Sequence, residues 1–277
     1  MKQLFVTDMD GTLLSPESRV DSESAAIISD LTRRGALITV ATARTPATVE
    51  PLLSATLTGA PPIVLTGASM WDRSDKTFLN PSLMPEELAE QVTAICTANG
   101  LRPMTYTLGA PGMIEMYVYG TPSAKEQKFL DERSRLPYKH INLLPGAQMP
   151  PCHENTMLIF AIGDIAAIQA VGEEIGRCTP CSYSAYPDIF NRSIGYLEVF
   201  APEVSKASAV LRLKELTGAD ELTVFGDNLN DIPMMRVADC AVAVENALDE
   251  VKAVAHEVIG PNSQPSVARY IQSHFRP

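Results

Sequence analysis

The first eighty residues alternate short apolar runs with segments of helical spacing. Residues 4–6, 36–41 and 61–65 are continuous apolar runs, as expected for strands that are covered on both faces. Between the first two runs, apolar positions at 25–28 and 31 form one helical stripe that ends at Arg33-Arg34-Gly35. Alternation of strand and helix in short units predicts an α/β fold with a parallel, Rossmann-like sheet flanked by helices.

The pattern changes near residue 81 and returns to the first type after residue 186. The stretch between them predicts helices at 85–100, 123–135 and 164–176, and strands at 113–119, 156–162 and 181–185. Residues 136–152 are rich in proline and are expected to be irregular. We therefore predict a catalytic core made of residues 1–81 and 187–277, with an inserted α+β cap domain at 82–186.

The last ninety residues repeat the core pattern. We expect a strand at 196–200, a helix at 205–217 and buried strands at 222–225 and 240–244, after which two more helices close the chain. These elements are expected to complete the sheet that the first eighty residues begin.

Composition narrows the class of protein. The chain has 277 residues, of which 45% are hydrophobic, as in ordinary globular proteins. No stretch approaches 18 uninterrupted apolar residues, and the N-terminus lacks the features of a signal peptide, so we expect a cytoplasmic protein without membrane contact. The formal net charge of −11 disfavours a nucleic-acid partner. The sequence does not indicate an oligomeric state.

The five cysteines are expected to be reduced thiols. Cys178 and Cys181 form one CxxC pair, for which a zinc site would need a second ligand pair that is not visible. A redox role would need the pair at the start of a helix in a thioredoxin-like unit. Whether the pair has a role stays open at this stage.

Acidic residues follow two of the predicted strands. Asp8 and Asp10 come after the first strand, and Asp227 follows the strand at 222–225. The carboxyl ends of parallel strands lie along one edge of a sheet, where ligands bind, so these loops can converge. An EF-hand calcium loop is disfavoured, because Thr12 stands at its third ligand position and Arg19 at its last.

These residue types suit phosphoryl transfer. Asp8 can attack as a carboxylate nucleophile, and Asp10 can act as general acid and then as general base. Asp8 and Asp227 are hard oxygen ligands suited to Mg²⁺. The Thr42 hydroxyl can hold a phosphoryl oxygen, and the Lys206 ammonium can offset the clustered negative charge.

Four motifs occur in the order found in the haloacid dehalogenase superfamily: Asp-x-Asp-Gly-Thr-Leu-Leu at 8–14, Thr42, Lys206 and Gly-Asp-x-x-Asn-Asp at 226–231. The large insert and the Glu-Val-Phe-Ala-Pro lead-in to Lys206 resemble the Cof-like subgroup with a type 2B cap. The resemblance implies a Mg²⁺-dependent phosphatase that hydrolyses sugar phosphates and other small phosphorylated metabolites through an aspartyl-phosphate.

The resemblance also implies site residues. The metal ligands would be Asp8, Asp227 and the backbone carbonyl of Asp10, with Asp231 supporting the metal site. The substrate would contact Thr42, Arg44, Thr66, Gly67, Lys206 and Asn230. Two positions depart from the subgroup: Ala43 stands where glycine is usual, and Thr66 stands where asparagine is usual.

Two other functions remain as alternatives. A sugar phosphomutase or phosphotransferase would use the same aspartyl-phosphate. A non-catalytic metabolite-binding protein would bind a metabolite without converting it. Near the return from the cap to the core, Arg192 is either a contact for an anionic substrate or a solvated surface residue, and the sequence does not decide between the two.

Overall fold

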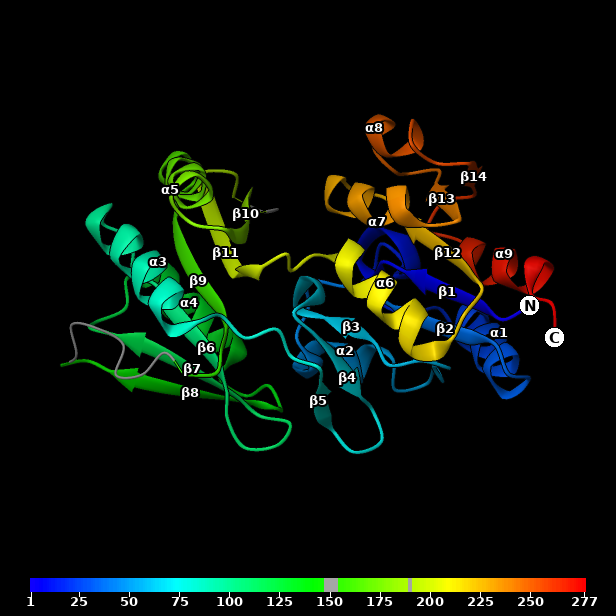
Figure 1. The fold of residues 1–277 in the computed structure, drawn as a ribbon, viewed down its shortest axis with the longest axis horizontal. Coiled ribbons are helices and arrows are strands. Elements are labelled where there is room, and N and C mark those ends of the chain that lie inside the picture. The colour runs from blue at the N-terminus through cyan, green and yellow to red at the C-terminus, as the bar shows by residue number, and fades with distance from the viewer. Residues whose placement is uncertain (147–153, 189–190) are drawn as a thin grey trace. The chain divides into compact units, whose positions relative to one another are not determined.

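The computed structural model describes residues 1–146, 154–188 and 191–277, and it confirms the α/β fold class. The chain forms two compact units (Figure 1). The first unit contains residues 1–75 and 205–277, and the second contains residues 76–204. None of the helices in the described residues is long and apolar enough to cross a membrane.

The first unit is built on a five-stranded parallel sheet of order β14-β13-β12-β1-β2. Its strands are β1 (Gln3–Thr7), β2 (Leu37–Val40), β12 (Glu221–Gly226), β13 (Cys240–Val244) and β14 (Glu257–Ile259). The central strand β1 is buried at every position. A parallel strand covered on both faces reads as one apolar run, which is why the sequence pattern located this sheet.

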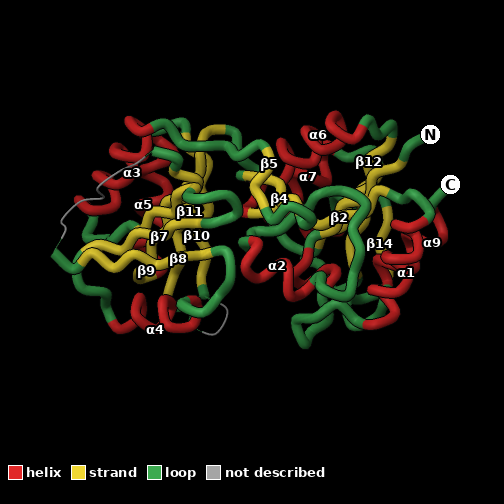
Figure 2. The backbone as a smooth tube through the Cα atoms, turned by 90° about the horizontal axis from the view of Figure 1, so that it is seen from below, coloured by secondary structure: helices red, strands yellow, loops and turns green. Residues whose placement is uncertain are grey.

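Helices cover both faces of this sheet. They are α1 (Ser22–Arg33), α2 (Pro46–Leu52), α6 (Lys206–Thr217), α7 (Ile232–Val237), α8 (Asp249–Lys252) and α9 (Ser266–His274). Helix α1 packs with α9 and α6 packs with α7, and Figure 2 shows these two pairs on opposite sides of the strands. The predicted closing segment of two helices also contains the short edge strand β14, which the pattern did not indicate.

The predicted strand at 61–65 is shorter in the structure. It forms β3 (Ile63–Val64) and is followed by a 3₁₀ turn at Leu65–Gly67. A small sheet of order β3-β4-β5 continues from it, with β4 at Ser69–Asp72 and β5 at Thr77–Leu79.

The second unit has a six-stranded sheet of order β10-β11-β9-β6-β7-β8. The strands are β6 (Met104–Leu108), β7 (Ile114–Tyr119), β8 (Lys139–Leu144), β9 (Thr156–Asp164), β10 (Cys181–Pro187) and β11 (Ile194–Pro202). The helices are α3 (Glu86–Ala98), α4 (Ala124–Arg133) and α5 (Ile165–Cys178). Helices α3 and α5 pack together on the sheet, and Figure 2 shows α4 across the sheet from α3.

Two predictions about this unit need correction, and one strand was missed. The strand predicted for the core at 196–200 is β11, which pairs with β9 and β10, so the second unit runs to Val204 instead of residue 186. Strand β6 was not predicted. Residues 139–144 were predicted to be irregular, but they pair with β7 as strand β8. Pairing partners distant in the chain decided these cases, because the local pattern is the same in either sheet.

The CxxC cysteines lie in the second unit and are free thiols. Cys178 ends α5 and is exposed, whereas Cys181 begins β10 and is buried. Burial raises the pKa of the Cys181 thiol, which makes it less reactive.

Candidate active site

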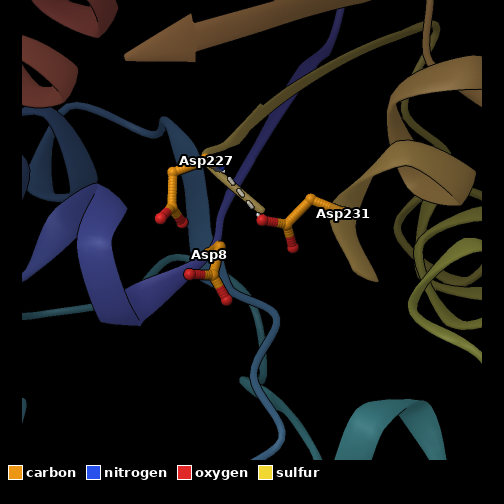
Figure 3. Close-up of side chains that lie close together, drawn as sticks. All are labelled: Asp8, Asp227 and Asp231. Carbon is orange, nitrogen blue, oxygen red and sulfur yellow. Dashed lines mark hydrogen bonds between the residues drawn. The ribbon is translucent and has the colours of Figure 1, made fainter. Parts of the chain in front are cut away.

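The two acidic loops meet because their strands are neighbours. Strands β1 and β12 are parallel, with Thr7 opposite Phe225. The loops that follow therefore leave the same edge of the sheet, and the backbone N–H of Asp8 donates to the carbonyl of Phe225 at 2.9 Å. This places Asp8 and Asp227 side by side, although they are more than 200 residues apart in the chain (Figure 3).

Lys206 lies between two carboxylates. It is the first residue of α6, whose N-cap is Ser205, and its side chain is 1% exposed. The ammonium donates a hydrogen bond to Oδ1 of Asp8 and a second one, of 2.7 Å, to Oδ1 of Asp231. Burial alone would lower the pKa of Lys206, but the two carboxylates outweigh it and raise the pKa above its ordinary value.

Asp231 holds the loop that carries Asp227. It is fully buried, and its Oδ2 accepts hydrogen bonds from the backbone N–H groups of Asp227 and Asn228, both at 3.1 Å. Figure 3 shows the first of these contacts as a dashed line. The carboxylate of Asp231 therefore links Lys206 to the turn after β12.

Asp227 is fixed by the loop after β1. The hydroxyl of Thr12 donates to Oδ1 of Asp227 at 2.8 Å. Gly11 has a φ of +82°, and a Cβ at this position would lie 2.3 Å from Oδ2 of Asp227. Glycine is therefore required both by the backbone conformation and by the approach of this carboxylate.

The three carboxylates fit a divalent cation. Ligand oxygens of Asp8, Asp227 and Asp231 lie within 4.8 Å of one another, and no other cluster of three or more such ligands occurs in the described residues. Burial, opposed by Lys206, raises the pKa of Asp8 to about 8, and burial raises that of Asp227 to about 6. One buried ammonium does not neutralise three carboxylates, and oxygen ligands of this kind suit Mg²⁺.

Asp10 is held by Arg44. The guanidinium donates two hydrogen bonds to the Asp10 carboxylate, from Nε at 2.7 Å and from a terminal nitrogen at 2.6 Å. Thr42 is buried, and its hydroxyl accepts the backbone N–H of Arg44 at 3.2 Å. The loop after β2 thereby places a hydroxyl and a guanidinium near the first acidic loop.

The turn at Leu65–Gly67 is strained. Leu65 and Thr66 have φ values of 52° and 55°, which are uncommon for residues with branched or bulky side chains. The backbone N–H of Thr66 donates to the carbonyl of Thr42, and its buried hydroxyl has no hydrogen-bond partner among the described residues. A Cβ on Gly67 would lie 2.2 Å from the carbonyl oxygen of Ser205, so glycine lets this turn approach the start of α6.

The remaining predicted residues lie as follows. Ala43 does not adopt a positive φ, so the loop forms without glycine at this position. Asn230 is exposed in the 3₁₀ turn Leu229–Asp231. Arg192 is an exposed residue in the turn before β11, within the second unit.

Sequence reasoning missed two side chains that hold the first acidic loop. These are Asn246, whose amide donates to the carbonyl of Gly11 at 2.8 Å, and Asn262, which donates to the carbonyl of Leu14 at 2.8 Å. Asn246 comes two residues after β13, at the same edge of the sheet. The rule that located Asp227 would have found it.

Comparison with known proteins identifies similar chains over the full length. The family model for haloacid dehalogenase-like hydrolases matches residues 5–271. Pyridoxal phosphate phosphatase YbhA of Escherichia coli is 26% identical, over 99% of this chain and 98% of its own length. HMP-PP phosphatase of Serratia proteamaculans is 26% identical, over 100% of this chain and 96% of its own.

A solved structure supports the fold. The crystal structure of a haloacid dehalogenase-like hydrolase from Bacteroides thetaiotaomicron superposes with a TM-score of 0.77 at 21% identity. The match covers 99% of this chain and 100% of that chain.

Proposed function

Because this chain belongs to the haloacid dehalogenase-like hydrolases, we propose that it is a Mg²⁺-dependent phosphatase acting on small phosphorylated metabolites through an aspartyl-phosphate at Asp8. The observation that carries the proposal is the buried cluster in which Lys206 joins Asp8 to Asp231 beside Asp227. The chain is also similar to two named phosphatases over nearly the full length of each.

Asp8 is the proposed nucleophile. Lys206 holds its Oδ1, whereas its Oδ2 has no hydrogen bond to the described part of the chain and is available for attack on phosphorus. The new bond joins Oδ2 to phosphorus as the ester P–O bond breaks. When bound by Asp8, Asp227 and the Asp10 carbonyl, Mg²⁺ would supply positive charge that keeps Asp8 ionised and stabilises the phosphoryl oxygens.

Asp10 is the proposed proton carrier. It would protonate the departing oxygen of the ester and then accept a proton from the water that hydrolyses the aspartyl-phosphate, which restores Asp8 and releases phosphate. Both oxygens of Asp10 are bound by Arg44 in the present structure. Each oxygen keeps a second lone pair that can carry the transferred proton, and a substrate anion is a competing partner for the guanidinium.

Thr42 and Lys206 are proposed to hold the phosphoryl group. The Thr42 hydroxyl accepts one backbone N–H and still has its own proton to donate to a phosphoryl oxygen. Lys206 retains its positive charge because its pKa is raised, so it can stabilise negative charge at the reacting centre.

Phosphate release from a substrate panel tests the proposal. The panel contains pyridoxal phosphate, sugar phosphates such as glucose 6-phosphate, and p-nitrophenyl phosphate, each assayed with Mg²⁺ and with a chelator. We expect release from at least one ester in Mg²⁺ and a loss of at least about 100-fold with the chelator. An isomerised ester without free phosphate would instead favour the phosphomutase alternative, and binding without turnover would favour a non-catalytic protein.

Mg²⁺ is expected to stabilise the protein more at pH 8 than at pH 5. The pKa values of Asp8 and Asp227 are raised in the folded state, to about 8 and about 6, so the folded protein binds these protons more tightly than the unfolded chain. Without metal, this contribution destabilises the fold as pH rises from about 4 towards 8. A cation that binds the ionised carboxylates competes with protons and therefore binds more weakly at low pH.

Thermal unfolding with and without saturating Mg²⁺ measures this effect. At 100 times the dissociation constant the gain is about 2.7 kcal/mol, or a Tm increase of roughly 5–10 °C at pH 8. Asp227→Asn is the control and should lose most of the increase. Equal increases at both pH values, or an unchanged increase in the variant, would contradict the assigned metal ligands.

A further inference from the structure

The second unit buries a carboxylate that the phosphate chemistry does not use. Glu198 lies in the middle of β11 and is 8% exposed. Its Oε1 accepts a hydrogen bond from the hydroxyl of Tyr186 at 3.0 Å, and no lysine or arginine in residues 1–146, 154–188 and 191–277 forms an ion pair with it. Burying a carboxylate without a cation is costly, so a ligand that supplies a positive charge would account for a carboxylate at this position.

A row of aromatic rings leads to this carboxylate. Phe129 of α4 stacks on Phe160 with ring centroids 4.9 Å apart, and Phe160 stacks on Tyr196 at 5.8 Å. Tyr196 in turn lies 5.8 Å from Tyr186. The row is covered by α4 at its Phe129 end, whereas Tyr186 at the other end is 38% exposed. It therefore ends in an accessible aromatic ring whose hydroxyl contacts Glu198.

Strand register places these groups on one face of the sheet. Tyr186 pairs with Tyr196, and Glu198 pairs with Phe160, so all four side chains project to the same side. Tyr183, three residues before Tyr186, projects to the opposite side, where its ring lies against Gly172 and Gly176 of α5.

We propose that Glu198 and Tyr186 form a binding site for a flat nitrogen heterocycle that carries a ring N–H donor. The ring would stack on the exposed face of Tyr186, and its N–H would donate to Glu198. A protonated ring nitrogen supplies a positive partner, which this carboxylate does not have among the described residues. Neutral hydroxyl groups of a sugar supply neither that charge nor a flat ring face.

The ligand is an unphosphorylated heterocycle that binds within the second unit, so the proposal is independent of the phosphate chemistry of the first unit. Burial raises the pKa of Glu198 to about 7, so a cationic ligand would bind with ionisation of this group.

Calorimetric titration of the full-length protein with pyridoxamine tests the site without catalysis. Its pyridine nitrogen is protonated near neutral pH, and it carries no phosphate. We expect saturable binding to the unchanged protein and a roughly 10- to 100-fold weaker affinity for Glu198→Gln, as for loss of a hydrogen bond to a charged group. The glutamine can still accept the Tyr186 hydroxyl, so a purely structural role predicts no change. No binding, or equal binding by the variant, would overturn the proposal whether or not the protein is a phosphatase.

Two matched variants serve as controls. Glu115→Gln makes the same change in the same sheet, at a glutamate whose partners are His140 and Asn142. Tyr183→Ala removes a tyrosine with the same 38% exposure as Tyr186, from the opposite face of β10. Both should bind pyridoxamine as the unchanged protein does, whereas Tyr186→Ala should bind at least about 10-fold more weakly.

Discussion

Asp8→Asn is expected to abolish phosphate release, with kcat lower by about 10⁴-fold or more. The amide oxygen is a poor nucleophile, and the buried site offers no other carboxylate in place to form the phosphoryl bond. Asp231 has its oxygens bound by Lys206 and by two backbone N–H groups, and Asp227 accepts from Thr12. The measurement is single-turnover release of phosphate in Mg²⁺ from the best substrate of the panel.

Thermal unfolding of Asp8→Asn shows whether its loss of activity comes from the missing nucleophile or from a damaged fold. Asparagine has nearly the same shape as aspartate, and Lys206 keeps its contact with Asp231. Burial raises the pKa of Asp8, so removing its charge relieves part of the cost of burying it. We expect the metal-free variant to unfold within a few degrees of the unchanged protein. Retention of more than a tenth of the activity by folded Asp8→Asn would rule out Asp8 as the nucleophile.

Asp10→Asn gives a finer comparison under the same assay. Loss of the proton donor should matter most for esters with poor leaving groups, because p-nitrophenolate departs without protonation. The loss should therefore be greater with a sugar phosphate than with p-nitrophenyl phosphate. An equal loss with both esters would contradict the assignment of Asp10 as the acid.

Lys206→Met is expected to lower both activity and stability. The change leaves Asp8 and Asp231 buried without their shared cation, and breaking a buried pair in this way costs about 3–5 kcal/mol. For a chain of this size the loss corresponds to a Tm decrease of roughly 5–15 °C. Activity should fall by about 10³-fold or more, because the positive charge at the reacting centre is lost.

Lys139→Met is a matched control, since Lys139 is the other lysine that is almost fully buried in the described residues. Its ammonium lies 4.6 Å from the centre of the Tyr106 ring, and burial lowers its pKa to about 8. Lys139 forms no ion pair with a carboxylate in the part of the chain that the structure describes, so replacing it with an apolar side chain should change stability by about 1 kcal/mol or less. Similar losses of stability in the two variants would show that Lys206 contributes through the packing of its side chain and not through its charge.

The acidic loops could be predicted because each follows a strand with a clear local signal. The runs before Asp8 and Asp227 are buried on both faces, so their apolar residues are continuous and their ends are easily located. Parallel strands expose their carboxyl ends at one edge, which brings these loops together without further information. The resemblance to the haloacid dehalogenase superfamily used the same residues and is confirmed by the family match.

Strand β11 shows where local reasoning failed. Its apolar residues fit the core sheet as well as the sheet of the second unit, and only pairing with β9 and β10 decides between them. The same limit hid β6 and β8, whose partners lie elsewhere in the chain. Register sets which side chains share a face, and it cannot be read from one strand alone.

The sequence by itself determined the fold class, the order of the motifs and the acidic residues at the sheet edge, because these depend on periodicity and on the direction of parallel strands. The tertiary structure decided which charges are partners. Lys206 joins Asp8 to Asp231, and Arg44 binds both oxygens of Asp10. Glu198 is buried beside a tyrosine and has no ion-pair partner in the described residues. Charge partners depend on distances between side chains that meet only after folding, so no local pattern of residues encodes them.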